Sequence, residues 1–393
     1  MYKVLTLNQI SVKGLERLPR ESYEIASEFS TPDAILLRSH KLQPIDITPS
    51  ILAVARAGAG VNNVPVAHCT EVGVPVFNTP GANANAVKEL IVAALTLGSR
   101  GILEGIEYVN SLGAIKDGAA MGQLLEQEKK RFKGNELTGK TLGVIGLGAI
   151  GSMVADTALS LGMQVAGYDP ALSVDAAWRL SSQVQKADNI SSLVSRSDYI
   201  TLHLPVLDST RGMVNADLLA YLKPGAVLLN FAREEIVDTA AIVEALNSGK
   251  LAKYIADFPS PALIGVKGAI LTPHIGASTD EAEENCAIMA ADQLKDFLEN
   301  GNIKNSVNFP TLNLERSAGY NSVRLSITNR NVPKILGHIL SILADENINV
   351  IDMLNKSRDE IAYNLIDVET VPPEAVLSKM RKVDGVVNVR LIA

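Results

Sequence analysis

The sequence predicts an α/β protein with a doubly wound parallel sheet and a C-terminal domain of ferredoxin-like order. Three observations support this fold class. Short apolar runs alternate with stretches of helical spacing, which is typical of βαβ units and parallel sheets. Aromatic residues make up only 4% of the chain, so Ala, Gly, Val, Ile and Leu fill the cores. The segment after residue 322 follows the order strand, helix, strand, strand, helix, strand.

The expected elements follow one another in three groups. Apolar runs in the first group predict strands at 3–7, 34–39, 52–60 and 74–81. Helical spacing over 83–112 and 121–132 separates them from a second group of strands at 141–148, 164–170, 199–205, 226–232 and 269–274. Residues 300–322 lose periodicity and are rich in Asn, Gly, Pro and Ser, which indicates a linker. The last group has strands at 323–329, 349–357, 361–369 and 386–392 and helices at 332–347 and 372–383.

The composition excludes several classes of function. The net charge of -7 offers no basic surface for nucleic acid, and no apolar run reaches the length of a membrane span. The only cysteines, Cys69 and Cys286, lie far apart and lack metal-ligand spacing, so we expect neither a disulfide nor a metal site. Because the N-terminal segment also lacks a signal-peptide pattern, we expect a cytoplasmic protein.

A glycine-rich turn predicts a dinucleotide site. Gly146, Gly148 and Gly151 have the spacing G-x-G-x-x-G between an apolar strand and a helix. Glycine permits a tight turn and the close approach of a pyrophosphate, and the helix N-terminus presents N–H groups to the anion. The next strand ends in Asp169, whose carboxylate accepts hydrogen bonds from a ribose diol and repels a 2′-phosphate. The pattern therefore favours NAD over NADP; glycines that merely make a turn are the alternative.

Polar residues also follow three later strands. His203, the segment Asn230–Arg233 and His274 lie where ligands bind in an open parallel sheet, beyond the carboxyl ends of the strands. Oxidation of a 2-hydroxy acid needs a base for the hydroxyl proton and a fixed cation for the carboxylate. His274 and Arg233 supply this pair, although each alone is also compatible with a structural histidine or a surface arginine.

Long, ordered motifs identify a family resemblance. The glycine turn with Asp169, "LKPGAVLLNFAREEIVD", "LTPHIGASTDEAEENCA" and "NTPGANANAVKELI" resemble the D-isomer-specific 2-hydroxyacid dehydrogenases over essentially the whole chain. The resemblance implies a flavodoxin-like substrate-binding domain, a Rossmann-type NAD-binding domain, an active site between them and a C-terminal ACT domain. The implied bounds are 1–90 with 283–310 for the substrate domain, 91–282 for the NAD-binding domain, 311–321 for a linker and 322–393 for the ACT-like domain.

The resemblance also implies roles for individual residues. His274 would be the general acid/base and Arg233 the carboxylate clamp. The implied cofactor contacts, with Asp257 near the nicotinamide amide, are Gly146, Gly148, Ala149, Ile150, Gly151, Asp169, His203, Phe231, Ala232, Arg233, Asp257 and Gly276. The implied substrate contacts are Arg38, Ser39, Ala59, Gly60 and Asn83. Arg38 is equally compatible with a plain strand-end charge, and Asn83 with a helix N-cap.

One part of the family pattern is missing. The family pairs its histidine with a glutamate, but here Pro261 or Ala262 stands at that position. Without this carboxylate, we expect His274 to take its orientation from another group, such as Glu281, or from water. We expect activity to survive, because Arg233, the histidine and the cofactor turn remain and positioning supplies much of the barrier reduction.

The implied reaction is the NAD-dependent oxidation of 3-phosphoglycerate to 3-phosphohydroxypyruvate, the first step of L-serine biosynthesis. Two alternatives stay open: a dehydrogenase of another short D-2-hydroxy acid (glycerate/hydroxypyruvate), or a non-catalytic NAD-sensing scaffold, which the missing glutamate favours. The ACT-like domain implies either L-serine as an effector, with contacts at Asn331 and Asn349, or a structural, dimerising role, because Lys334 replaces the usual glycine of its loop. A homodimer or homotetramer is also implied.

Overall fold

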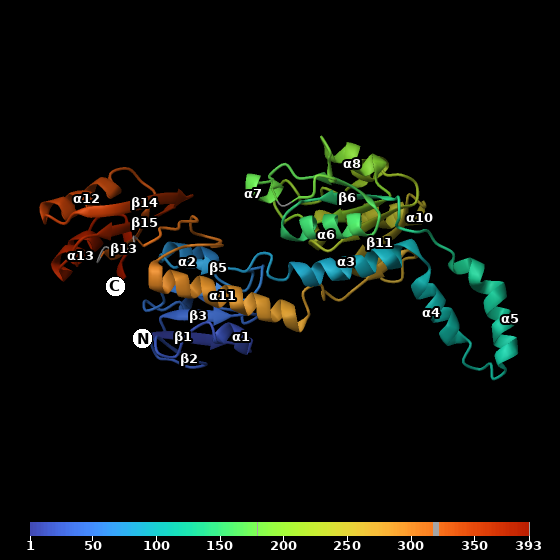
Figure 1. Ribbon diagram of the computed structural model, residues 1–393, viewed down its shortest axis with the longest axis horizontal. Helices are drawn as coiled ribbons and strands as arrows, with labels where there is room; N and C mark the ends of the chain where they lie inside the picture. Colours follow the sequence, from blue (N-terminus) through green and yellow to red (C-terminus); the bar gives the residue numbers. More distant parts are fainter. Residues whose placement is uncertain (179, 317–321, 393) are drawn as a thin grey trace. The chain divides into compact units, whose positions relative to one another are not determined.

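The computed structural model describes residues 1–178, 180–316 and 322–392, which divide into two compact units. Unit 1 comprises Met1–Asn83 and Asp280–Ala393, and unit 2 comprises Ala84–Thr279. The chain crosses between the units just before two long helices, α3 (Ala84–Ser99) and α11 (Asp280–Asn300) (Figure 1). The borders expected at 90–91 and 282–283 fall inside these helices, whose continuous backbone hydrogen bonding keeps each helix in one unit.

Unit 1 contains a parallel sheet of flavodoxin-like order. Its strands are β1 (Tyr2–Leu7), β2 (Tyr23–Ala26), β3 (Ala34–Leu37), β4 (Ala53–Arg56) and β5 (Val76–Phe77). They pair in the order β2-β1-β3-β4-β5, and each adjacent pair is parallel. The accompanying helices are α1 (Val12–Leu15), η1 (Pro44–Asp46) and α2 (Val66–Glu71). Ala287, Ala290 and Leu294 of α11 pack in one core with β1, β3 and β4, so the segment after residue 280 completes this domain.

Unit 2 has the strand order of a Rossmann fold. Its strands are β6 (Thr141–Ile145), β7 (Gln164–Tyr168), β8 (Gln185–Lys186), β9 (Tyr199–Leu202), β10 (Ala226–Asn230), β11 (Leu251–Ala256) and β12 (Ala269–Leu271). They pair in parallel in the order β12-β11-β10-β9-β6-β7-β8, which changes direction between β6 and β9. Helices cover both faces: α6 (Ala149–Ser160), α7 (Val174–Ala177), α8 (Ile190–Arg196), α9 (Ala216–Ala220), η3 (Glu234–Ile236), α10 (Thr239–Asn247) and η4 (Pro261–Leu263).

The helical stretch expected at 83–112 is broken in two. α3 ends at Ser99, and α4 (Ile102–Ser111) follows after Gly101, where a Cβ would lie 3.0 Å from the Phe132 Cα atom. α4 then forms an extended arm with α5 (Gly118–Glu128) and η2 (Lys129–Phe132) (Figure 1). Apolar spacing continues across the break, so periodicity alone could not locate it.

The C-terminal domain has the ferredoxin-like fold that the sequence predicts. It consists of β13 (Val323–Arg330), α12 (Ile335–Asp345), β14 (Val350–Arg358), β15 (Ile361–Val368), α13 (Glu374–Arg381) and β16 (Val386–Ile392). The strands pair antiparallel in the order β14-β15-β13-β16. One sheet face packs on α12 and α13, and residues of the other, including Tyr363 and Leu365, join the core of unit 1 beside Phe309.

The segment expected as a linker is packed rather than extended over the surface. Ile303 and Leu312 form an antiparallel bridge, and both are fully buried with Phe309. Residues 317–321 of this segment lie outside the described part of the chain. No helix among the described residues is long and apolar enough to cross a membrane.

Candidate active site

The three glycines of the turn after β6 each meet a different steric requirement. Gly146 has φ +90°, and a Cβ there would lie 2.5 Å from the carbonyl oxygen of His203. A Cβ on Gly151 would overlap the Gly146 carbonyl oxygen, so only glycine allows the helix to approach the turn. Gly148, the N-cap of α6, has open space around its Cβ position, and Ala149 and Ile150 form the first turn. The turn therefore fits a pyrophosphate at the N-terminus of α6.

Asp169 lies just after β7 and is already partly engaged. Its Oδ2 accepts a hydrogen bond from the Leu147 backbone N–H at 2.8 Å, and its Oδ1 accepts one from Ala171 N–H at 2.9 Å. These bonds fix the carboxylate beside the glycine turn and leave lone pairs on both oxygens. The residue therefore fits a ribose diol, and together with the glycine turn it offers the contacts that NAD requires.

His203 follows β9, beside the point where the strand order changes direction. Its Nε2 lies 3.0 Å from the Thr201 hydroxyl oxygen, and its Nδ1 is buried with no hydrogen-bond partner among the described residues. Burial lowers the pKa of His203 to about 3, so the ring is neutral near neutral pH. A half-buried ring that stays neutral beside the glycine turn suits a supporting role in the cofactor site better than proton transfer at physiological pH.

Phe258 brings the two expected catalytic residues together. The ring centroids of Phe258 and His274 lie 4.7 Å apart, and the Arg233 guanidinium carbon lies 5.8 Å from the Phe258 ring centroid. His274 and Arg233 are both exposed, whereas their neighbours Phe231 and Ala232 are buried. The sequence reasoning missed Phe258, because a contact between rings on two separate loops leaves no spacing signal.

Asp257 holds the loop that carries His274. Its carboxylate is 2% exposed and accepts hydrogen bonds from Thr272 Oγ1 at 2.6 Å, Ile275 N–H at 2.8 Å and Gly276 N–H at 2.6 Å. His274 itself has φ +57°, a left-handed conformation that costs free energy for a residue with a Cβ. The carboxylate therefore stabilises a strained backbone at the histidine. The expected contact of Asp257 with the nicotinamide amide stays a prediction.

The position of the missing glutamate is occupied by a short apolar turn. Pro261 and Ala262 begin η4, and Leu263 is buried beneath them. Among the residues of unit 2 that the structure describes, the His274 ring has no hydrogen bond or ion pair and touches Phe258 instead. Orientation of the ring by Glu281 of α11 stays a prediction, since that residue belongs to unit 1.

The expected anion contacts of unit 1 gather at the carboxyl ends of β3 and β4. Arg38 follows β3, and its carbonyl oxygen accepts a hydrogen bond from Arg56 Nε at 3.0 Å. Ser39 N–H donates to Asn8 Oδ1 at 3.0 Å, which fixes the loop after Arg38. Arg56, which ends β4, was missed by the sequence reasoning. Its signal was available, because arginine follows the apolar residues of two consecutive strands.

The turn after β4 presents backbone donors. Gly58 has φ +157°, and a Cβ there would lie 2.5 Å from Arg56 Nη1. The carbonyl oxygen of Ala59 accepts a hydrogen bond from Asn78 Nδ2 at 2.6 Å, whereas the Ala59 and Gly60 N–H groups have no acceptor among the described residues of unit 1. The turn therefore fits a carboxylate or phosphate. Asn83 directly precedes α3, and its contact with the substrate stays a prediction.

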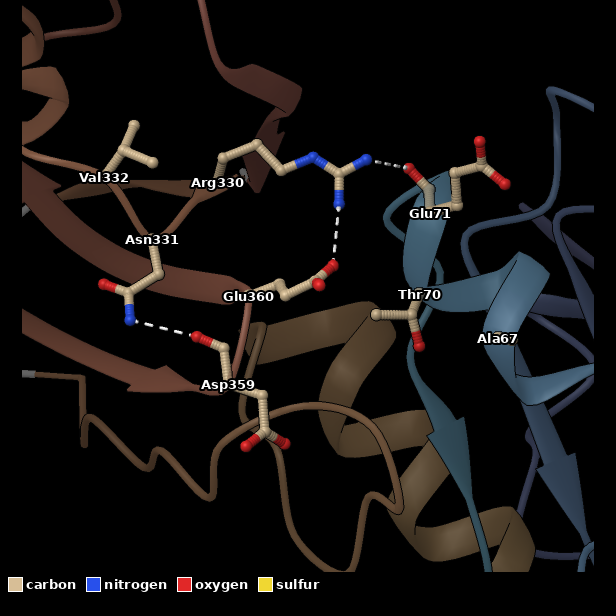
Figure 2. A pocket seen from close by; sticks show the side chains of 8 residues that line it. All are labelled: Ala67, Thr70, Glu71, Arg330, Asn331, Val332, Asp359 and Glu360. Atoms are coloured by element: carbon tan, nitrogen blue, oxygen red, sulfur yellow. Dashed lines mark hydrogen bonds and ion pairs between the residues drawn. The ribbon is translucent and has the colours of Figure 1, made fainter.

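A separate cavity of about 640 Å³ lies between α2 and the C-terminal domain within unit 1 (Figure 2). Arg330 projects into it, with Nη2 3.4 Å from the Glu71 carbonyl oxygen and Nη1 4.0 Å from a Glu360 carboxylate oxygen. Asn331, one of the two expected effector contacts, lines this cavity and donates to the Asp359 carbonyl oxygen at 3.1 Å. The other, Asn349, donates to Glu369 at 2.8 Å and is not among the lining residues.

Comparison with known proteins agrees with this geometry. Residues 106–276 match the family model of the NAD binding domain of D-isomer specific 2-hydroxyacid dehydrogenases. D-3-phosphoglycerate dehydrogenase of Haemophilus influenzae is 33% identical over 88% of this chain and 83% of that protein. The Escherichia coli K12 protein of the same name is 31% identical over the same shares. The solved NAD+-bound 3-phosphoglycerate dehydrogenase of Entamoeba histolytica is 27% identical with a TM-score of 0.61, covering 79% of this chain and 99% of that chain.

The Rossmann sheet, its glycine turn and the adjacent histidine and arginine define an NAD-dependent oxidoreductase. The chain belongs to the D-isomer specific 2-hydroxyacid dehydrogenase family, in which the relatives named above are D-3-phosphoglycerate dehydrogenases. The resemblance and fold class predicted from the sequence are confirmed.

Proposed function

We propose that this chain oxidises D-3-phosphoglycerate to 3-phosphohydroxypyruvate with NAD, the first step of L-serine biosynthesis. The observation that carries the proposal is the grouping of His274 and Arg233 around Phe258, beyond the strand ends of an NAD-binding sheet. The names of the relatives support the particular substrate. Arg38 and Arg56 support it as well, because a phosphorylated acid needs cations beyond the one that holds its carboxylate.

In the proposed mechanism, each residue has one task. Arg233 holds the substrate carboxylate, and its exposed guanidinium carries the donors for a bidentate contact. His274 accepts the proton of the C2 hydroxyl as that oxygen becomes a carbonyl. When bound, NAD supplies the acceptor for the hydride that leaves C2. Gly148 and the first turn of α6 would hold its pyrophosphate, and Asp169 would hold its ribose.

The test is NADH absorbance with 3-phosphoglycerate, with glycerate and with no substrate. We expect the highest kcat/KM with 3-phosphoglycerate, and losses of at least about 100-fold in His274→Ala and Arg233→Ala, because a general base and a charge clamp each contribute about that factor. Turnover of glycerate with equal efficiency would instead favour the broader D-2-hydroxy acid dehydrogenase. NAD binding without turnover of any 2-hydroxy acid would favour the sensing scaffold and refute the proposal.

The proposed function includes a homodimer formed through the arm of α4 and α5. On α4, Ile106 and Val109 are 54% and 50% exposed, and no residue of α4 or α5 is buried within the described part of the protein. An amphipathic helix with an uncovered apolar side is typical of an interface. Sedimentation velocity should show a dimer or tetramer, and Ile106→Glu with Val109→Glu should dissociate it. A monomeric wild type would contradict this part.

The proposed effector is L-serine, bound in the cavity that contains Asn331. Arg330 would pair with its carboxylate and Glu71 or Glu360 with its ammonium group. Equilibrium dialysis should show retention of L-serine that Asn331→Ala abolishes. No retention at millimolar concentration would leave the structural role of the domain. A cytoplasmic location accompanies the proposed pathway.

A further inference from the structure

Arg38, the residue after β3, forms an ion pair with Glu283. Arg38 Nη2 lies 2.6 Å from the Glu283 Oε1 atom, and the two side chains are 39% and 41% exposed. Glu283 lies in the first turn of α11, so β3 and the start of α11 are joined here. The guanidinium that we assign to the substrate phosphate is therefore already paired with a carboxylate of the same chain.

The charges around this pair favour an exchange of anions. Arg56 lies beside Arg38 and donates to the Arg38 carbonyl oxygen, so two guanidinium groups follow neighbouring strands. Cys286 lies one helical turn beyond Glu283. Burial raises the pKa of the Cys286 thiol, and the charges of Arg38, Arg56 and Glu283 act on it as well. A phosphate dianion carries more charge than the carboxylate it would replace, so it attracts the Arg38 guanidinium more strongly.

We propose that Glu283 is a specificity-determining residue: it holds the anion position on Arg38 in the free protein, and the substrate phosphate displaces it on binding. The proposal rests on the proposed function. Every phosphorylated substrate must then break the Arg38–Glu283 pair, whereas glycerate, which lacks the phosphate, leaves the pair intact. Glu283 thereby raises the KM for phosphorylated 2-hydroxy acids alone.

The test compares Glu283→Gln with a matched control, Glu284→Gln. Glu284 is the next residue of α11 and pairs with Lys13 at 2.6 Å, so both variants remove one charge and one ion pair of the same length from the same helix. For Glu283→Gln we expect the KM for 3-phosphoglycerate to fall by up to about fivefold, because an exposed ion pair contributes at most about 1 kcal/mol. The KM for glycerate and both kcat values should stay within about 1.5-fold of wild type. Glu284→Gln should change none of these values.

The outcomes separate this proposal from the proposed function. A wild type that does not oxidise 3-phosphoglycerate refutes the proposed function, and this inference with it. An active wild type refutes the inference alone if Glu283→Gln leaves the KM for 3-phosphoglycerate unchanged, raises it, or lowers it equally for glycerate. A lower KM for 3-phosphoglycerate in both Glu283→Gln and Glu284→Gln also refutes the inference, because the effect would then come from the change in net charge. As a second readout, the inhibition constant of inorganic phosphate against glycerate oxidation should fall in Glu283→Gln by the same factor as the KM.

Discussion

Replacing Asp257 by Asn tests whether this carboxylate positions the catalytic histidine. In the wild type, Oδ1 accepts hydrogen bonds from Thr272 Oγ1 and Ile275 N–H, and Oδ2 accepts one from Gly276 N–H. An asparagine that keeps the first two contacts turns its NH2 group toward the Gly276 N–H. Two donors then face each other at a residue that is only 2% exposed.

The loss of stability in Asp257→Asn follows from the lost hydrogen bond with the Gly276 N–H. A hydrogen bond to a charged acceptor contributes about 1.5–3 kcal/mol, and a buried donor without a partner adds to this. Because the three contacts flank His274, the cost falls on the loop that holds its left-handed backbone, with φ +57°. A loss of about 2–3 kcal/mol lowers the population of the active loop, and with it kcat, by about 30–150-fold.

Steady-state kinetics with varied NAD and saturating 3-phosphoglycerate provide the assay. If Asp257 positions the loop, kcat falls and the KM for NAD stays within about twofold. Thr272→Val is the matched control, because it removes one neutral donor from the same carboxylate and should reduce kcat by only about fivefold. An unchanged kcat in Asp257→Asn would refute the reasoning. A raised KM for NAD with unchanged kcat would instead assign Asp257 to the nicotinamide amide.

Three further predictions concern stability and are measured by urea unfolding. Because the pKa of His203 is lowered to about 3 from ~6.5 in the unfolded state, the unfolded protein binds an extra proton between these values, so stability is lost as pH falls. From pH 7 to 5.5 the wild type should lose about 1.3 kcal/mol more than His203→Gln; equal losses would contradict the assignment. Lys334 has φ +78°, so Lys334→Gly should raise the free energy of unfolding by about 0.5–1 kcal/mol. Lys382 has φ -88°, so the control Lys382→Gly should lower it. Asp367→Ala removes the carboxylate that pairs with the buried Arg324 and should lower the free energy of unfolding by about 3–5 kcal/mol. The double variant Arg324→Met with Asp367→Leu should lower it less, because no charge is left buried. A larger loss in the double variant would contradict this explanation.

The parts of the fold that the sequence predicted are those with local, repeated signals. Apart from β2, β8 and β11, which were not predicted, the parallel strands of both sheets follow from apolar runs between turn residues, as does the ferredoxin-like order. β11 was missed because Lys253 interrupts its apolar pattern. The structure explains this lysine: its ammonium group donates to the carbonyl oxygens of Leu97 and Arg100 at 2.8 and 3.0 Å, at the end of α3. A tertiary contact therefore determined the residue, and no local rule could reveal it.

Some residues of the candidate site could likewise be predicted from the sequence, and others could not. The glycine turn and Asp169 could be predicted because their spacing and their chemistry are fixed by one continuous strand–turn–helix segment. Phe258 and the loop contacts of Asp257 could not, since they depend on how two loops after β11 and β12 approach each other. Glu283 was overlooked for the same reason, as its partner lies more than two hundred residues away in the chain.

Helix α11 connects the C-terminal domain to the anion-binding residues of unit 1. Its first turn carries Glu283, and its last carbonyl groups are capped by arginines of the C-terminal sheet: Arg390 donates to the Phe297 carbonyl oxygen, and Arg324 to that of Asn300 at 3.0 Å. Cations at a helix C-terminus stabilise its dipole, and both arginines lie in the sheet that also completes the core of unit 1. Removal of residues 322–393 would therefore uncap the helix that positions Glu283 against Arg38. A change in KM in a truncated protein would report this structural loss, so regulation by the C-terminal domain is better tested by substitutions in its cavity.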